Sequence, residues 1–171
     1  MIRAIRAFFA VVAVAVLASC GGGDSLQPSK TYQGPPITQI VVKKADRKMY
    51  LVSGKEVVKS YKIDLGNQPL GHKQFEGDGR TPEGLYFIDR FNPRSRYHLS
   101  VGISYPSAQD VANAAARGQR PGGDIFIHGL GPEGRALNRP DWTAGCIAVT
   151  DEEIEEIFTM LRPGVPIFIY P

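Results

Sequence analysis

The chain has 171 residues, of which 43% are hydrophobic and 22% charged, a composition typical of a globular protein with one full core. The net charge is only +3, and the 20 lysines and arginines are scattered, which argues against nucleic acid as a partner. The 19 glycines and 13 prolines favour many turns and short strands over long helices.

Residues 1–19 have the features of an export signal. Arg3 and Arg6 precede an apolar run over residues 7–17, which is shorter than a usual membrane-spanning helix. The run ends in Leu-Ala-Ser-Cys20, which resembles the bacterial lipobox. The resemblance implies cleavage before Cys20 and lipidation of this cysteine. The alternatives are an ordinary signal peptide with a chance cysteine, or an uncleaved anchor.

Residues 20–36 read as a flexible tether, because they open on three glycines after Cys20 and close on Gly-Pro-Pro. We therefore expect an exported protein that is lipid-anchored in the bacterial cell envelope and faces the periplasm. An aspartate directly after the lipidated cysteine would resemble an inner-membrane retention signal. Gly21 stands at this position instead, which favours the outer membrane. The folded domain is expected over residues 37–171.

The patterns after the tether predict a mainly-β sandwich or barrel with two short helices. Alternating or apolar runs predict strands over residues 40–42, 49–52, 57–65, 85–89, 97–105, 125–127 and 165–170. Helices are expected over 108–117 and 151–161, because each run follows a capping-box pattern. Residues 66–84 and 129–142 are expected to be loops. Residues 77–84 are expected to form a flap near the site, with ordinary turn chemistry as the alternative.

One thiol and one imidazole stand out, each beside a glycine at the end of a short apolar run. His128 follows Ile-Phe-Ile, and Cys146 follows Gly145. A thiol becomes a strong nucleophile when a base removes its proton, and histidine is the usual base. If Cys20 carries lipid, Cys146 is left unpaired, and catalysis is the leading reason for such a thiol; a disulfide between the two is the formal alternative. A catalytic Cys146 is expected to have a lowered pKa. Alone, it would more simply be a buried apolar residue.

The run from His128-Gly129 to Thr-Ala-Gly-Cys146 resembles the active-site signature of the L,D-transpeptidase (YkuD-type) catalytic domain. Two further stretches, over residues 71–86 and 97–106, are similar to the same family. The likeness covers roughly residues 37–171. It implies a mainly-β fold and a cysteine acyl-transfer reaction on peptidoglycan stem peptides, at the L-centre that precedes a D-residue.

The resemblance also implies the roles of individual residues. Cys146 would be the nucleophile and His128 the base, with the carbonyl of Gly129 orienting the imidazole through its other nitrogen. Backbone N–H groups of Ala144, Gly145 and Cys146 would hold the oxyanion.

The chain departs from the family pattern at two positions. Ala144 stands where a histidine is usual, and Ala148 stands where an arginine is frequent. The second loss removes a group that would hold stem carboxylates, and Arg135, Arg139 or Arg80 could take its place. The residues expected to contact substrate are Thr143, Trp142, Arg135 and Arg80.

These observations predict a membrane-anchored enzyme of the cell envelope that needs no metal and no cofactor and binds peptidoglycan rather than nucleic acid. Transfer of the acyl group to an amine, for wall crosslinking or remodelling, is the first interpretation. Hydrolysis of the same bonds, as an L,D-carboxypeptidase or endopeptidase, also fits the pattern. A non-catalytic wall-binding lipoprotein is the alternative from another class.

Overall fold

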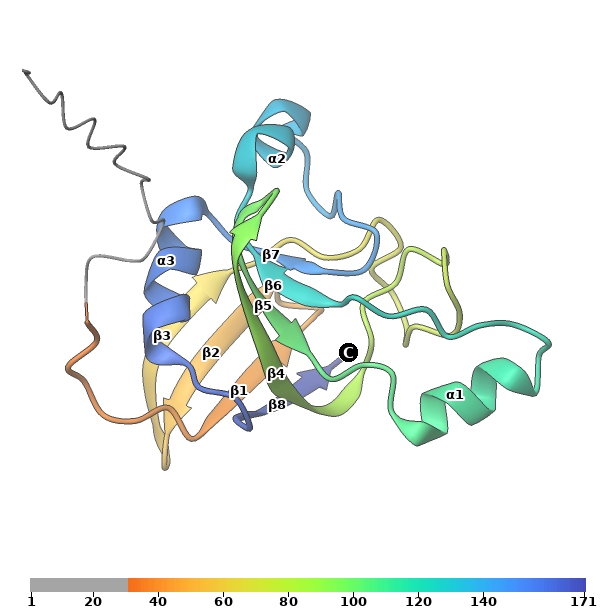
Figure 1. Cartoon of the computed structure of the whole chain (residues 1–171), viewed down its shortest axis with the longest axis horizontal. Helices are drawn as coiled ribbons and strands as arrows, with labels where there is room; N and C mark the ends of the chain where they lie inside the picture. The colour runs from red at the N-terminus through yellow and green to blue at the C-terminus, as the bar shows by residue number, and fades with distance from the viewer. Residues whose placement is uncertain (1–30) are drawn as a thin grey trace, which may run out of the picture.

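The computed structural model describes residues 31–171. The expected signal peptide, Cys20 and the tether up to residue 30 lie outside these residues. The described part contains eight strands and three helices (Figure 1): β1 (Gln39–Lys43), β2 (Lys48–Ser53), β3 (Glu56–Lys62), β4 (Gly84–Ser95), β5 (His98–Ile103), α1 (Ala108–Ala115), β6 (Phe126–His128), α2 (Gly131–Leu137), β7 (Ile147–Ala148), α3 (Asp151–Met160) and β8 (Pro166–Tyr170). Within residues 31–171, no helix is both long and apolar enough to cross a membrane.

The strands follow the order β3-β2-β1-β8-β4-β5-β6-β7. Strand β4 belongs to both halves of this order, because its first residues pair with β8 and the following ones with β5. It extends to Ser95, beyond the predicted 85–89, with register shifts that accommodate Pro93. The mainly-β class is confirmed. The barrel alternative is wrong, because the sheet is not closed: the segment after β3 meets the segment around β7 only through two isolated bridges, Asp64–Ala148 and Gly66–Thr143.

The core lies on the inner faces of the two halves, as the period-two alternation predicts. In β1, Ile40 and Val42 point inward, and the parallel register sets them beside Ile167 and Ile169 of β8. All four side chains are at most 2% exposed. The β1–β8 pair therefore forms the centre of the core in the half of the sheet that contains β1, β2, β3 and β8.

Helices α1 and α3 form where the capping patterns predict them. Ser107 and Asp110 make the capping box of α1, and Thr150 and Glu153 make that of α3. Figure 1 shows the two helices at opposite sides of the molecule. Helix α3 packs against β5 and buries Ile154 and Ile157 completely.

The segment expected to be one loop, residues 129–142, contains the short helix α2. A proline in its first turn pre-sets the backbone, and Asn138 ends it in the left-handed conformation. Gly134 lets the helix lie against Trp142, because a Cβ at Gly134 would meet the indole ring at 2.6 Å. Two glycines and a proline in seven residues hid this helix, so the prediction of only two helices was wrong.

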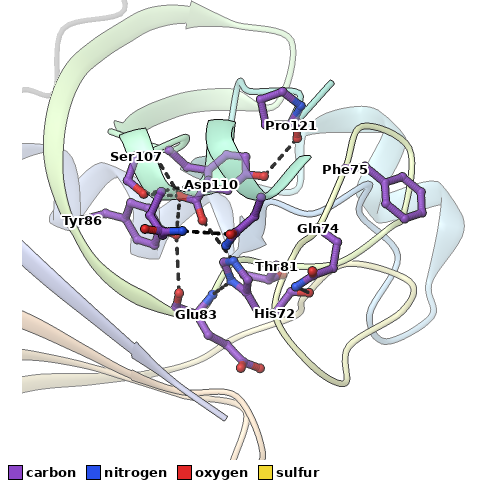
Figure 2. Close-up of polar contacts among 12 residues, drawn as sticks. His72, Gln74, Phe75, Thr81, Glu83, Tyr86, Ser107, Asp110 and Pro121 are labelled. Atoms are coloured by element: carbon purple, nitrogen blue, oxygen red, sulfur yellow. Dashed lines mark hydrogen bonds and ion pairs between the residues drawn. The ribbon is translucent and has the colours of Figure 1, made fainter. Parts of the chain in front are cut away.

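Helix α1 is tied to the rest of the fold through the buried carboxylate of Asp110 (Figure 2). One oxygen accepts a hydrogen bond from His72 Nε2 at 3.0 Å, and the other accepts from Tyr86 Oη at 2.9 Å and from the N–H and hydroxyl of Ser107. The backbone N–H of Glu83 donates to His72 Nδ1 at 2.9 Å, so Nε2 is the nitrogen that donates to Asp110. The cluster connects β4, α1 and the connection before β4.

That connection, residues 66–84, is anchored by a buried lysine. Lys44 is 2% exposed, and its ammonium donates to the carbonyl oxygens of Gly71 and Thr81 and pairs with Glu83 at 2.8 Å. Burial lowers the pKa of Lys44, and the carboxylate of Glu83 opposes this shift. The predicted long loop is therefore present, and its backbone is fixed at several points.

Candidate active site

The parallel pair β6–β7 brings the thiol and the imidazole onto one face. Ile127 lies opposite Ile147, and His128 lies opposite Ala148. Continued one residue back, this register sets Cys146 opposite Phe126. Because side chains alternate along a strand, Cys146 and His128 project from the same face as diagonal neighbours. Such positions are about 7–8 Å apart between Cα atoms, close enough for an imidazole to approach a thiol.

The thiol of Cys146 is partly exposed and unpaired with any other cysteine of the described part. Its sulfur donates a hydrogen bond to the carbonyl oxygen of Asp124 at 3.5 Å. Burial raises the pKa of Cys146 above its usual 9.0, while a hydrogen bond from the backbone of Phe126 lowers it. Burial prevails, so the expectation of a lowered pKa was wrong: the resting group is a neutral thiol that needs a base.

His128 is 2% exposed and has one fixed tautomer. Its Nδ1 donates to the carbonyl oxygen of Gly129 at 2.6 Å, so the other nitrogen, Nε2, keeps a lone pair. Burial lowers the pKa of His128 below its usual 6.5, and the Gly129 carbonyl and the carboxylate of Asp151 oppose this shift. The ring is therefore a neutral base at neutral pH.

Two aromatic rings hold the imidazole in place. Tyr97 stacks on His128 with 4.5 Å between ring centroids, and Trp142 meets it edge-on at 5.6 Å. Tyr97 and Trp142 also contact each other at 5.6 Å. This cage fixes the plane of the ring and supplies the burial that lowers its pKa.

Gly129 is required by close approach as well as by its carbonyl. A Cβ there would lie 2.5 Å from Asp151 Oδ1 and 2.9 Å from the carbonyl oxygen of Tyr97. The same Asp151 oxygen accepts the N–H of Gly131 at 2.9 Å, and the other oxygen pairs with Arg135. The start of α3 and the start of α2 are thus joined beside the histidine.

The turn before Cys146 is braced by Thr143. This residue is 4% exposed, and its hydroxyl donates to the carbonyl of Cys146 at 2.7 Å and accepts the N–H of Gly145 at 3.1 Å. The hydroxyl expected to contact substrate is thus used within the turn. Of the three expected oxyanion donors, the N–H of Gly145 already has a partner. The N–H groups of Ala144 and Cys146 remain the candidates.

Gly145 adopts φ +136, and a Cβ there would lie 2.6 Å from the carbonyl oxygen of Arg80. The connection after β3 therefore packs directly against the thiol turn. The guanidinium of Arg80 is directed elsewhere, because one of its nitrogens lies beside Gly71. Arg80 thus shapes the site through its backbone.

The structure adds two cations that the sequence did not single out. Lys73 and Arg90 lie near the thiol, where their positive charge favours the thiolate. Lys73 also pairs with Asp78 at 2.9 Å. No local pattern could have identified them, since they come from different strands and loops.

The remaining histidines are elsewhere: His72 contacts Asp110, and His98 contacts Glu155 at 2.7 Å.

Comparisons with known proteins identify the family of the chain. The family model of the L,D-transpeptidase catalytic domain (YkuD) matches residues 37–169. The chain belongs to this family. The Escherichia coli K12 protein named "Putative L,D-transpeptidase YafK" is 30% identical over 99% of this chain and 70% of its own length.

Two solved structures have a similar fold. Pgp2 of Campylobacter jejuni, described as a helical cell shape determining protein, superposes with a TM-score of 0.62 at 26% identity, over 86% of this chain and 51% of Pgp2. Bd1075 of Bdellovibrio bacteriovorus has a TM-score of 0.54 at 25% identity, over 79% of this chain and 48% of Bd1075. The chain spans about half the length of these two proteins.

Proposed function

We propose that the chain is a cysteine acyltransferase that acts on peptidoglycan stem peptides, with Cys146 as nucleophile and His128 as base. Membership of the L,D-transpeptidase family supports an activity on peptidoglycan. The observation that carries the assignment of residues is the register of β6 and β7, which sets a neutral thiol and a neutral, fixed imidazole on one face.

The first half of the reaction forms an acyl-enzyme. Rotation about χ1 of Cys146 takes the sulfur from the Asp124 carbonyl toward His128 Nε2, which removes the thiol proton as Sγ attacks the carbonyl carbon of the stem. The N–H groups of Ala144 and Cys146 would stabilise the oxyanion. The C–N bond then breaks, and the amine leaves with the proton from His128.

The second half releases the enzyme. An amine of a neighbouring stem attacks the thioester, His128 takes one of its protons, and the C–S bond breaks to return the thiol. Water in place of the amine gives hydrolysis with the same proton transfers. The hydrogen bond from Nδ1 to Gly129 acts in both halves of the reaction. It keeps Nδ1 and its proton away from the sulfur, so that Nε2 is the nitrogen that accepts and returns the transferred proton.

We place this enzyme in the bacterial cell envelope, lipid-anchored through Cys20 and facing the periplasm, most simply at the outer membrane. This placement rests on the signal-like residues 1–19 and the lipobox-like sequence before Cys20. Growth with a radiolabelled fatty acid tests it. Label on the wild-type chain and none on the Cys20→Ala variant supports the anchor, whereas equal label on both contradicts it.

Incubation of the purified chain with disaccharide-tetrapeptides tests the activity. Dimers indicate transfer, and shortened monomers indicate hydrolysis. The Cys146→Ala variant should form neither, and intact-mass analysis of the wild type should show the acyl adduct on Cys146. If Cys146→Ala changes muropeptide composition in cells as the wild type does, the chain is a wall-binding protein and the proposal is wrong.

A further inference from the structure

A groove runs along the outside of the site between α2 and the end of β3. Its larger part, of about 510 Å³, and a smaller part, of about 190 Å³, share Lys62, Asp64 and Leu130. The wall on the α2 side includes Arg139 and Trp142. The smaller part reaches Ala148, Val149, Thr150 and Glu153.

We propose that this groove binds the amine component of the reaction, which is the leaving group of the first step and the acceptor of the second, by its free carboxylate. The chemical class is an amine whose adjacent carbon carries a carboxylate, as in a free D-amino acid. The inference rests on the proposed function and names a subsite of the same centre.

The position of the groove relative to the proton donor is the first argument. His128 must give its proton to the leaving amine, so this amine lies on the histidine side of the sulfur. The groove is on that side, because Ala148 is paired with His128 and Trp142 touches the imidazole ring. The acyl part of the substrate would then lie on the opposite side of the sulfur, toward Asp124.

The charge of the groove is the second argument. Lys62 and Arg139 are exposed, and neither forms an ion pair within residues 31–171. Lys62 also stands directly opposite Lys48, which stands opposite Lys43. Like charges that face one another across strands destabilise a sheet, so an anion bound at this end relieves the repulsion.

The carboxylates of the groove are consistent with a ligand that carries both charges. Asp64 forms an antiparallel bridge with Ala148, so its side chain shares the face of Ala148 and His128. A bound amino group would lie between Asp64 and His128, with its carboxylate toward Lys62. Glu153 lines only the smaller part of the groove, and Arg139 lines only the larger part.

Trp142 lines the larger part of the groove and supplies a probe of ligand binding. Because Trp142 is the only tryptophan, its fluorescence reports on this groove alone.

The Cys146→Ala variant of the full chain, titrated with D-alanine and with D-alaninamide, tests the inference by Trp142 fluorescence and by calorimetry. We expect saturable binding of D-alanine and at least tenfold weaker binding of the amide. Adding Lys62→Gln with Arg139→Gln should weaken D-alanine binding at least tenfold. The matched pair Lys55→Gln with Arg117→Gln, exposed cations of other surfaces, should leave it unchanged.

Equal binding of acid and amide, no binding of either, or binding that survives loss of both groove cations would overturn the inference. A second experiment separates it from the proposed function. The wild type should form the acyl-enzyme faster from a stem with a free terminal carboxylate than from its amide, and the Lys62→Gln, Arg139→Gln variant should lose this preference. If the wild type forms the acyl-enzyme equally fast from both stems, the inference about the groove is wrong and the proposed function stands. If no acyl-enzyme forms, the proposed function itself is wrong.

Discussion

Arg47 and Asp141, ninety-four positions apart, join the β1–β2 turn to the segment that leads into Cys146. The guanidinium donates from Nε at 3.0 Å and from a terminal nitrogen at 2.6 Å to the two carboxylate oxygens. Asp141 also accepts the N–H of Leu65 at 3.0 Å. One carboxylate therefore fixes the thiol segment to two other parts of the chain.

We expect Arg47→Gln to lower the free energy of unfolding by about 1–3 kcal/mol, because it leaves a part-buried carboxylate with a weaker partner. The measurement is urea unfolding. The control is Arg96→Gln, which breaks an exposed pair with Glu133 and should cost at most about 1 kcal/mol. Equal losses in the two variants would show that the Arg47–Asp141 pair contributes no more than a surface pair.

The lowered pKa of His128 gives stability a pH dependence with a definite sign. In the unfolded chain His128 binds a proton near pH 6.5, and in the folded chain it binds the proton only at lower pH. The contribution is therefore fully present above 6.5 and is lost as pH falls through 6.5 toward the folded-state pKa. Urea unfolding between pH 5 and 7 should show a smaller loss in His128→Gln than in the wild type, and the acylation rate of the wild type should fall in the same acidic range.

The raised pKa of Cys146 predicts slow alkylation. Iodoacetamide should label the folded chain more slowly than it labels a free cysteine at pH 7.5, because only the thiolate reacts, and the rate should keep rising above pH 9. Peptide mapping of timed samples measures the rate. Labelling faster than that of free cysteine at neutral pH would mean that the base has already taken the proton.

Replacing Gly145 should disable the site. Gly145→Ala places a Cβ in a left-handed backbone and 2.6 Å from the carbonyl of Arg80, so we expect a loss of about 2–4 kcal/mol and no detectable acyl-enzyme. Gly118→Ala is the control, because φ is +66 there and nothing lies within 4 Å. It should cost about 1 kcal/mol and leave acylation intact.

The Asp110 cluster predicts a purely structural effect. Asp110→Ala removes the acceptor of His72, Tyr86 and Ser107 and should lower the free energy of unfolding by about 2–4 kcal/mol. The acylation rate below the melting temperature should stay within about twofold of the wild type, because the cluster does not contact Cys146. Asn113→Ala on the exposed face of α1 is the control and should change stability by less than about 0.5 kcal/mol.

Local signals in the sequence predict much of the fold. Both capping boxes are correct because the donor and acceptor lie three residues apart, and alternation predicts β1 and β8 because each buries one face. Helix α2 was missed because its stability comes from contact with Trp142 and not from its own propensity. Strand β7 was missed because its two residues are too few to show the alternation of buried and exposed side chains that marks a strand.

The site was predictable only in part. Cys146 and His128 stand out because of their chemistry and flanking glycines. Tyr97, Lys73 and Arg90 do not, because their relation to the site exists only after strands distant in sequence have paired. The raised pKa of Cys146 was likewise hidden, since burial is a property of the packed chain.

The shortness of β7 has a consequence for how this scaffold tolerates change. Two residues, Ile147 and Ala148, set the phase of the thiol, and slipping by one position would turn Cys146 to the opposite side of the sheet. A single residue inserted between Cys146 and Ile147 would therefore turn the thiol away from His128, even if the rest of the sheet kept its pairing.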